Sequence, residues 1–321
     1  MGAALPASQA QETQSAPSAR EVKEATLGAG HLALFRELGD LKRIHSADAH
    51  GSIAERLFVV AWQSLMAGNN PSSVMAHSVA AALAATRLGD LDRRKLEQLG
   101  LATSEAVEVL ERGFSEVGAV LDPALTARLN AALAEAPLDT AAAPNFVLQL
   151  CRQPRAGVTC PGRPRLMLEP AENHAEHSFV VALYGVLAAP VYGADPTAVF
   201  MAAMGHHLHS AAMPDSGYTG EVLLKDKLGL VIDRARALAF VQLPTALAAA
   251  LGAALAPIAS DRTPEARAFH AADVIDRVLE IEHHLQAARI TMGDVLADYG
   301  LVHAGPVKQF HDRVLKDVGL L

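Results

Sequence analysis

Two segments of this 321-residue chain, separated by about 120 positions, are nearly the same. Residues 54–62 read AERLFVVAW and residues 175–183 read AEHSFVVAL, so six of the nine positions agree. Further along, residues 70–85 and 195–210 also align, with proline on proline. An internal match of this kind predicts that the chain is a tandem duplication, in which two copies of one fold are joined.

The pattern within each copy predicts helices. Apolar residues recur at helical spacing in nearly every window, and no run of alternating β-branched residues predicts a strand. Apolar residues make up 51% of the chain and aromatic residues only 4%, so the core must be built mainly from alanine, leucine and valine. Alanine and leucine are strong helix formers. We therefore predict an all-α protein with tandem duplicated helical bundles.

The domain boundaries follow from composition. The first twenty residues are polar and rich in Ala, Ser, Gln and Pro, which is typical of a disordered leader. A segment near the middle, EAPLDTAAAPN, has two prolines and little apolar pattern, which is typical of a linker. The expected parts are a leader, a first helical domain without metal ligands, a linker and a second domain with the candidate site: 1–30, 31–134, 135–145 and 146–321.

Bulk properties exclude several classes of function. The net charge is −8 and no basic run is present, so we expect no nucleic-acid partner. The chain has two cysteines, Cys151 and Cys160, with no second pair to complete a zinc ribbon, which favours a reducing compartment. The N-terminus lacks the features of a signal peptide, so we expect the protein in the cytoplasm. The apolar run 237–259 is long enough to span a membrane, but it contains Gln242 and Pro244 and is mostly alanine. We predict a buried helix there and no membrane association.

Histidines and aspartates gather on three predicted helices of the second half. Residues three or four apart share one face of a helix, so each segment can present its polar side chains together. Imidazole and carboxylate groups from three helices that meet in a bundle core can hold a transition metal. The side chains that share a face are His174 and His177, then His206 and His209, and finally His270, Asp273 and Asp276.

The first copy lacks these groups. Arg56 aligns with His177, and two alanines align with His206 and His207. Any metal chemistry is therefore expected in the second half, with the first half as a scaffold or lid.

These motifs resemble those of the HD-domain metal-dependent phosphohydrolases, and most closely the branch that contains the bacterial 5′-deoxynucleotidases. That branch has a basic segment before an E-N/S-x-x-E-H-S helix, which is similar to RPRLMLEPAENHAEHS at 163–178. It also has a late Asp helix that AADVIDRVLEIEHH resembles. The resemblance covers about residues 146–290, with a fainter trace over 32–134. It implies HD-like helical bundles and a bound metal ion.

The resemblance implies roles for individual residues. His177 and His206 match the first two metal ligands, and Asp273 matches the last. Arg163 lies one residue out of register with the family's phosphate-contacting arginine, so Arg165 is an alternative.

The chain departs from the family at two positions. His207 stands where the family has an aspartate ligand, and Ser210 stands where an acidic residue is expected. With His207 as fourth ligand the site carries one negative charge instead of two, which favours Fe, Co, Ni or Zn over Mg or Mn. A neutral imidazole cannot bridge two metal ions, so a dinuclear centre is disfavoured.

The loop after the histidine cluster supplies further candidates, because loops over a site often carry catalytic groups. Asp215 and Glu221 can take over proton transfer in place of the missing acid, with His209 beside them. The candidates for contacting the substrate, beside the two arginines, are Tyr218, His174 and His270.

Three functions are compatible with this pattern. The favoured one is a metal-dependent hydrolase that cleaves a small, nucleotide-like phosphomonoester through a metal-activated water. One alternative is a non-haem iron oxygenase of HD type, since histidine-rich ligation suits Fe(II). The other is a non-catalytic binding or regulatory protein. The expected partner is a small-molecule substrate, and the sequence leaves a homo-oligomer open.

Overall fold

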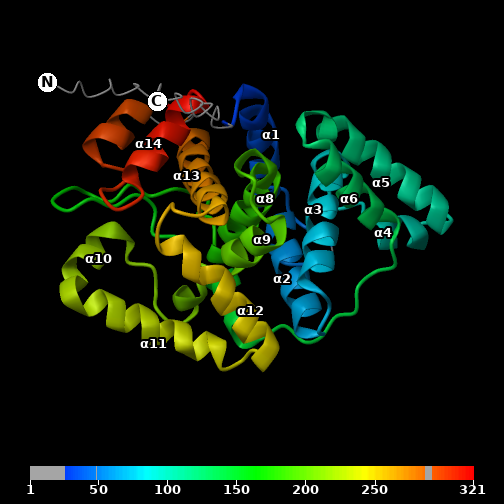
Figure 1. Ribbon diagram of the computed structural model, residues 1–321, viewed down its shortest axis with the longest axis horizontal. Coiled ribbons are helices and arrows are strands. Elements are labelled where there is room, and N and C mark those ends of the chain that lie inside the picture. Colours follow the sequence, from blue (N-terminus) through cyan, green and yellow to red (C-terminus); the bar gives the residue numbers. More distant parts are fainter. Residues whose placement is uncertain (1–25, 48, 286–290) are drawn as a thin grey trace, which may run out of the picture.

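The computed structural model describes residues 26–47, 49–285 and 291–321, and these residues are all-α, as predicted (Figure 1). They form no strand, and short 3₁₀ turns join many of the helices. The α-helices are α1 (Ala29–Gly39), α2 (Ile53–Met66), α3 (Pro71–Leu88), α4 (Arg93–Gln98), α5 (Thr103–Val117), α6 (Pro123–Ala134), α7 (Asn145–Arg152), α8 (His174–Tyr192), α9 (Pro196–Gly205), α10 (Gly217–Leu224), α11 (Leu228–Phe240), α12 (Thr245–Leu255), α13 (Pro264–Leu285) and α14 (Lys308–Asp317).

Helix starts in the two halves use the same local chemistry. Both α3 and α9 begin with proline at the first helical position, where the missing N–H costs nothing. The side chains of Asn70 and Asp195 cap these two helices by accepting backbone N–H bonds. The aligned prolines of the two halves therefore both stand at helix starts.

Further local features recur in the two halves. An isolated antiparallel bridge precedes α2, between His45 and Ser52, and another precedes α8, between Pro154 and Asn173. After the second helix of each pair, an aspartate accepts a backbone N–H from this earlier segment: Asp90 from Ala47 and Asp215 from Ala156. A duplication predicts such parallels, although the duplication itself stays a prediction.

Helix α8 is the central element, with α2, α7, α9 and α13 packed around it (Figure 1). All its residues from His174 to Ala189 are buried. Small side chains permit this, and Gly185 lies so close to Val199 of α9 that an added Cβ would be 2.6 Å from its methyl group. Among the described helices, α8 alone is long and apolar enough to cross a membrane, but 83% of that window is buried inside the fold. It is the core helix of this protein.

The two halves share one core and exchange polar contacts. At the N-termini of α2 and α8, the side-chain amide of Asn173 donates to Glu55 at 2.6 Å, and Ser52 donates to Glu176. In the core, the Tyr184 ring stacks on Phe35 at 4.5 Å between centroids, and its hydroxyl donates to the Phe35 carbonyl. One continuous cluster of buried apolar side chains spans both halves.

The structure describes the predicted linker and the end of the predicted leader. Residues 1–25 of the predicted leader lie outside the described residues, while Ala29 and Gly30 already belong to α1. Residues 135–144 contain no helix and join α6 to α7. They run along α2 and α3, where the Asn69 side chain donates to the Asp139 carbonyl at 2.8 Å.

Candidate metal centre

Three helices bring His177, His206 and Asp273 together. His177 lies in the first turn of α8, His206 is the C-cap of α9, and Asp273 lies within α13. The sequence pattern had placed His206 and His209 on one helical face, but α9 ends at Gly205 and a 3₁₀ turn follows from Leu208. The His206 ring bonds the Ala203 carbonyl at 2.6 Å, so it caps the end of the helix instead of continuing it.

Hydrogen bonds fix which nitrogen of each imidazole is free. A carbonyl oxygen can only accept, so Nδ1 of His206 carries the hydrogen that it donates to Ala203. Nδ1 of His177 lies 2.7 Å from a carboxylate oxygen of Asp276 and donates to it in the same way. Nε2 is therefore the ring nitrogen of each imidazole that these two bonds leave available.

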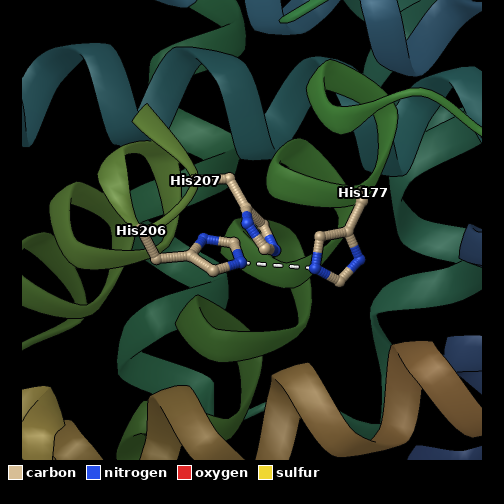
Figure 2. Close-up of side chains that lie close together, drawn as sticks. All are labelled: His177, His206 and His207. Carbon is tan, nitrogen blue, oxygen red and sulfur yellow. Dashed lines mark hydrogen bonds between the residues drawn. The ribbon is translucent and has the colours of Figure 1, made fainter. Parts of the chain in front are cut away.

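The two Nε2 atoms face one another and are joined by a hydrogen bond (Figure 2). The two Nε2 atoms are 3.2 Å apart, and Oδ1 of Asp273 lies 3.3 Å from that of His177 and 4.0 Å from that of His206. Three acceptors this close repel one another unless a proton or a metal ion lies between them. Ligands of a tetrahedral metal at bond lengths of ~2.05 Å are about 3.3 Å apart, so the arrangement fits a metal ion.

The pKa shifts have the same cause. The pKa of His177 is raised, because Asp273 and Asp276 outweigh burial and Arg155, which lower it. Burial and the neighbouring His177 lower the pKa of His206 to about 3. Burial raises the pKa of Asp273, but its hydrogen bond to His177 and the charge of Arg277 outweigh that effect and hold it well below its usual range. These shifts favour a protonated His177, whose Nε2–H lies beside the lone pair of His206 and the carboxylate of Asp273, and a bound metal ion would replace this proton.

His207 belongs to the same cluster but points its Nε2 elsewhere. A ring nitrogen of each of His177, His206 and His207 lies within 4.8 Å of the others, so the three form a group that could hold a metal ion. In this structure, however, Nη1 of Arg155 lies 3.1 Å from Nε2 of His207. A guanidinium can only donate, so this Nε2 accepts from Arg155. His207 as fourth ligand stays a prediction, and its Nδ1 has no hydrogen-bond partner among the described residues.

A cleft lies against the outer side of His207 and Arg155. It is lined by four residues that the sequence singled out, His207, Asp215, Tyr218 and Glu221, and by others that it did not, including Arg155, Arg277 and His303. His177, His206 and Asp273 do not line the cleft, whereas their neighbour His207 does. Asp273 keeps 18% of its side-chain surface exposed, so solvent reaches the centre.

The remaining predicted residues lie apart from the cleft. Arg163 is exposed, 5.6 Å from the Tyr299 ring, and Arg165 donates to the Ala156 carbonyl at 2.9 Å. His270 bonds the Ile258 carbonyl. Two predicted residues pack against His207 from within the protein, at ring distances of 4.7 and 5.5 Å: His174 and His209.

Asp215 and Glu221 occupy different environments. Each carboxylate oxygen of Asp215 accepts a backbone N–H, one from Ala156 and one from Gly217. Asp215 therefore holds the loop, whereas Glu221 is an exposed residue at the rim of the cleft.

Sequence reasoning missed the residues that come from other parts of the chain. Lys42, from the first half, is buried against Asp276 and Glu280 of α13. Asp276 binds this lysine and His177. The one sequence signal for such partners is the row of acidic residues at 273, 276 and 280, which lie on one face of α13 and need cations nearby if they are buried.

The first half has an arginine at the position that aligns with His177 in the sequence. This residue, Arg56, forms a 2.8 Å ion pair with Asp90. Among the described residues of that half, no three His, Cys, Asp or Glu side chains come close enough together to hold a metal ion.

Comparison with protein-family models, curated proteins and solved structures gives no match. The HD resemblance therefore rests on the motifs and their order in the sequence.

Proposed function

We propose that this protein is a metal-dependent hydrolase of HD type that cleaves a small, nucleotide-like phosphomonoester in the cytoplasm. The observation that supports it best is the convergence of three potential ligand atoms, from His177, His206 and Asp273, beside a cleft that is lined by Arg277, whose guanidinium forms no ion pair or hydrogen bond with the described residues.

His177, His206 and Asp273 would hold the metal ion. Both imidazoles are already oriented by bonds to Asp276 and Ala203, as is usual for metal-ligating histidines. A bound Fe, Co, Ni or Zn ion would supply Lewis-acid activation of water and of the phosphoryl group.

Arg277 is the best-placed residue for the phosphate. It lines the cleft one helical turn from Asp273, and it has no ion pair or hydrogen bond with any residue that the structure describes. A guanidinium in this state can form paired, charge-assisted hydrogen bonds to phosphate oxygens. Arg155 is less available, because it donates to His207 and lies 3.6 Å from Glu172.

His303 and Glu221 can transfer protons in this site. They would replace the acidic residue that the HD family has at the position of Ser210. Burial, followed by the charge of Arg277, lowers the pKa of His303 to about 4, so the ring is neutral at pH 7 and keeps a lone pair, although it is a weaker base than an ordinary histidine. It stacks on Tyr218 at 3.7 Å, which holds it over the cleft. Proton transfer by one positioned side chain typically contributes about 10²–10⁴-fold to a rate.

The donor set itself favours a second candidate. Two histidines and one carboxylate are also the ligands of non-haem Fe(II) oxygenases. If His207 keeps its bond to Arg155, the centre has this set of three ligands and open positions for O₂.

Metal analysis of the purified protein tests both readings, followed by turnover assays on nucleotides and related phosphomonoesters. His206→Ala should abolish stoichiometric metal and activity, while the matched variant His209→Ala, in the same segment, should keep the metal. Phosphate release supports the hydrolase, and iron with O₂ consumption supports the oxygenase. A wild-type protein that binds no metal would contradict both and favour a non-catalytic binding role.

A further inference from the structure

One ammonium group of the first half lies among three carboxylates behind the metal centre. Nζ of Lys42 is 2.8 Å from Glu172, 2.9 Å from Asp276 and 2.8 Å from Glu280. Only 3% of the Lys42 side chain is exposed, and 7%, 1% and 5% of its partners. Charges are expensive to bury unless they are paired, so this arrangement needs all of its members.

The three carboxylates do not depend on Lys42 equally. Glu172 has a second cationic neighbour in Arg155 at 3.6 Å, and Glu280 has Arg43 at 2.7 Å. Among the described residues, Lys42 is the only lysine or arginine paired with Asp276. Lys42 is therefore the basic side chain among the described residues that holds Asp276 in place.

Asp276 in turn sets the geometry of His177. One of its oxygens accepts from Lys42 and the other accepts from Nδ1 of His177 at 2.7 Å. That bond keeps the hydrogen on Nδ1 and aims Nε2 at His206 and Asp273. Metal-ligating histidines commonly donate their other N–H to a carboxylate, and loss of such a partner costs about 10- to 100-fold in metal affinity.

We propose that Lys42 is a positioning residue for the metal centre, by which the first half orients a ligand of the second through Asp276 and His177. This rests on the metal site of the proposed function but not on the reaction catalysed. It gives the first half, which lacks ligands of its own, a direct part in metal binding.

The test compares Glu280→Gln with the double variant Lys42→Met/Glu280→Gln. The double variant removes one positive and one negative charge, so the cluster keeps its net charge, and the single variant is the matched control. Co²⁺ affinity is measured by competition with a chromophoric chelator, and the visible absorption of bound Co²⁺ reports its ligand geometry. No turnover is needed.

We expect Glu280→Gln to bind Co²⁺ like the wild type. The double variant should bind it about 10- to 100-fold more weakly, with an altered spectrum. When Asp276→Asn is present as well, removing Lys42 should cost little more, because the lysine acts through that aspartate. A purely structural lysine would instead weaken the protein in either background and leave the Co²⁺ spectrum unchanged.

The outcomes are separable. If the double variant binds Co²⁺ with the affinity and spectrum of its control, Lys42 does not position the ligand and the proposal is overturned. If the double variant fails to fold, Asp276→Asn alone decides, since normal Co²⁺ binding by that variant also overturns the proposal. A wild-type protein without Co²⁺ affinity contradicts the proposed function and this inference together.

Discussion

Two aspartates three residues apart on α13 occupy different surroundings. Asp273 faces Nε2 of the two histidines and keeps some exposure to solvent. Asp276 is 1% exposed and lies between an ammonium group and an imidazole N–H. The first is suited to hold a metal ion and the second to orient the group that does so.

Replacement of Arg277 by Met should raise KM for a phosphorylated substrate roughly 10- to 100-fold, because charge-assisted hydrogen bonds to phosphate are worth about 1.5–3 kcal/mol. Steady-state kinetics measures this effect. Arg163→Met is the matched control, since Arg163 lies on the surface beside Tyr299 and Asp298 and does not line the cleft. Equal effects of the two substitutions would contradict the assignment.

The Cys151 thiol should be unreactive in the folded protein. Burial, with the nearby Glu55 and Glu176 carboxylates, raises its pKa to about 12, and the thiolate is the reactive form. At pH 8, iodoacetamide should label Cys151 about 1,000-fold more slowly in the folded than in the denatured chain, as three pKa units imply. Mass spectrometry of the labelled peptides measures both rates, and equal rates would show that the thiol is accessible and ionisable.

At the scale of elements, helix ends carry much of the candidate site. His177 lies in the first turn of α8, and His206 caps the last turn of α9, where its ring bonds a free carbonyl. A helix end leaves backbone groups unpaired, so polar side chains gather there for structural reasons. Here the same bonds leave one nitrogen of each imidazole free.

Helix α14 should weaken in acid through His311. Burial lowers the pKa of this side chain to about 4, while in the unfolded chain it is close to 6.5. The folded state thus holds His311 neutral, so its contribution is present above pH 6.5 and is lost as the pH falls towards 4. The loss is at most about 3 kcal/mol.

Urea unfolding at pH 7.5 and pH 4.5 measures this loss. His311→Gln should lose less stability over that interval than the wild type, whereas His45→Gln, at an exposed site, should behave like the wild type. An unchanged pH dependence in His311→Gln would assign the acid sensitivity to other groups.

At the scale of the whole molecule, the two halves share one apolar core and several polar contacts. The Tyr184–Phe35 stack, the capping exchange between α2 and α8, and Lys42 all join groups across the boundary. The cost of burying these polar groups is offset only while both halves are present.

Cleavage at a protease site inserted near Asp139, in the helix-free segment 135–144, should therefore leave the halves associated. Size-exclusion chromatography should show one species of unchanged size, and thermal unfolding should show one transition. The fragment 146–321 expressed alone should be unfolded or aggregated, because it exposes the core surface of α8. A soluble, cooperatively folded fragment would show that the second half is autonomous.

The sequence alone determined the helices, their capped starts and the three segments that supply His177, His206 and Asp273, because periodicity and capping act over a few residues. It could not assign Lys42 to Asp276, 234 positions away, place Arg277 in the cleft, or detect the bond between Arg155 and His207. These facts depend on which helix faces which, and packing of the two halves around α8 decides that. Burial then selects the pairings, since a charge inside this core is tolerated only beside its counter-charge.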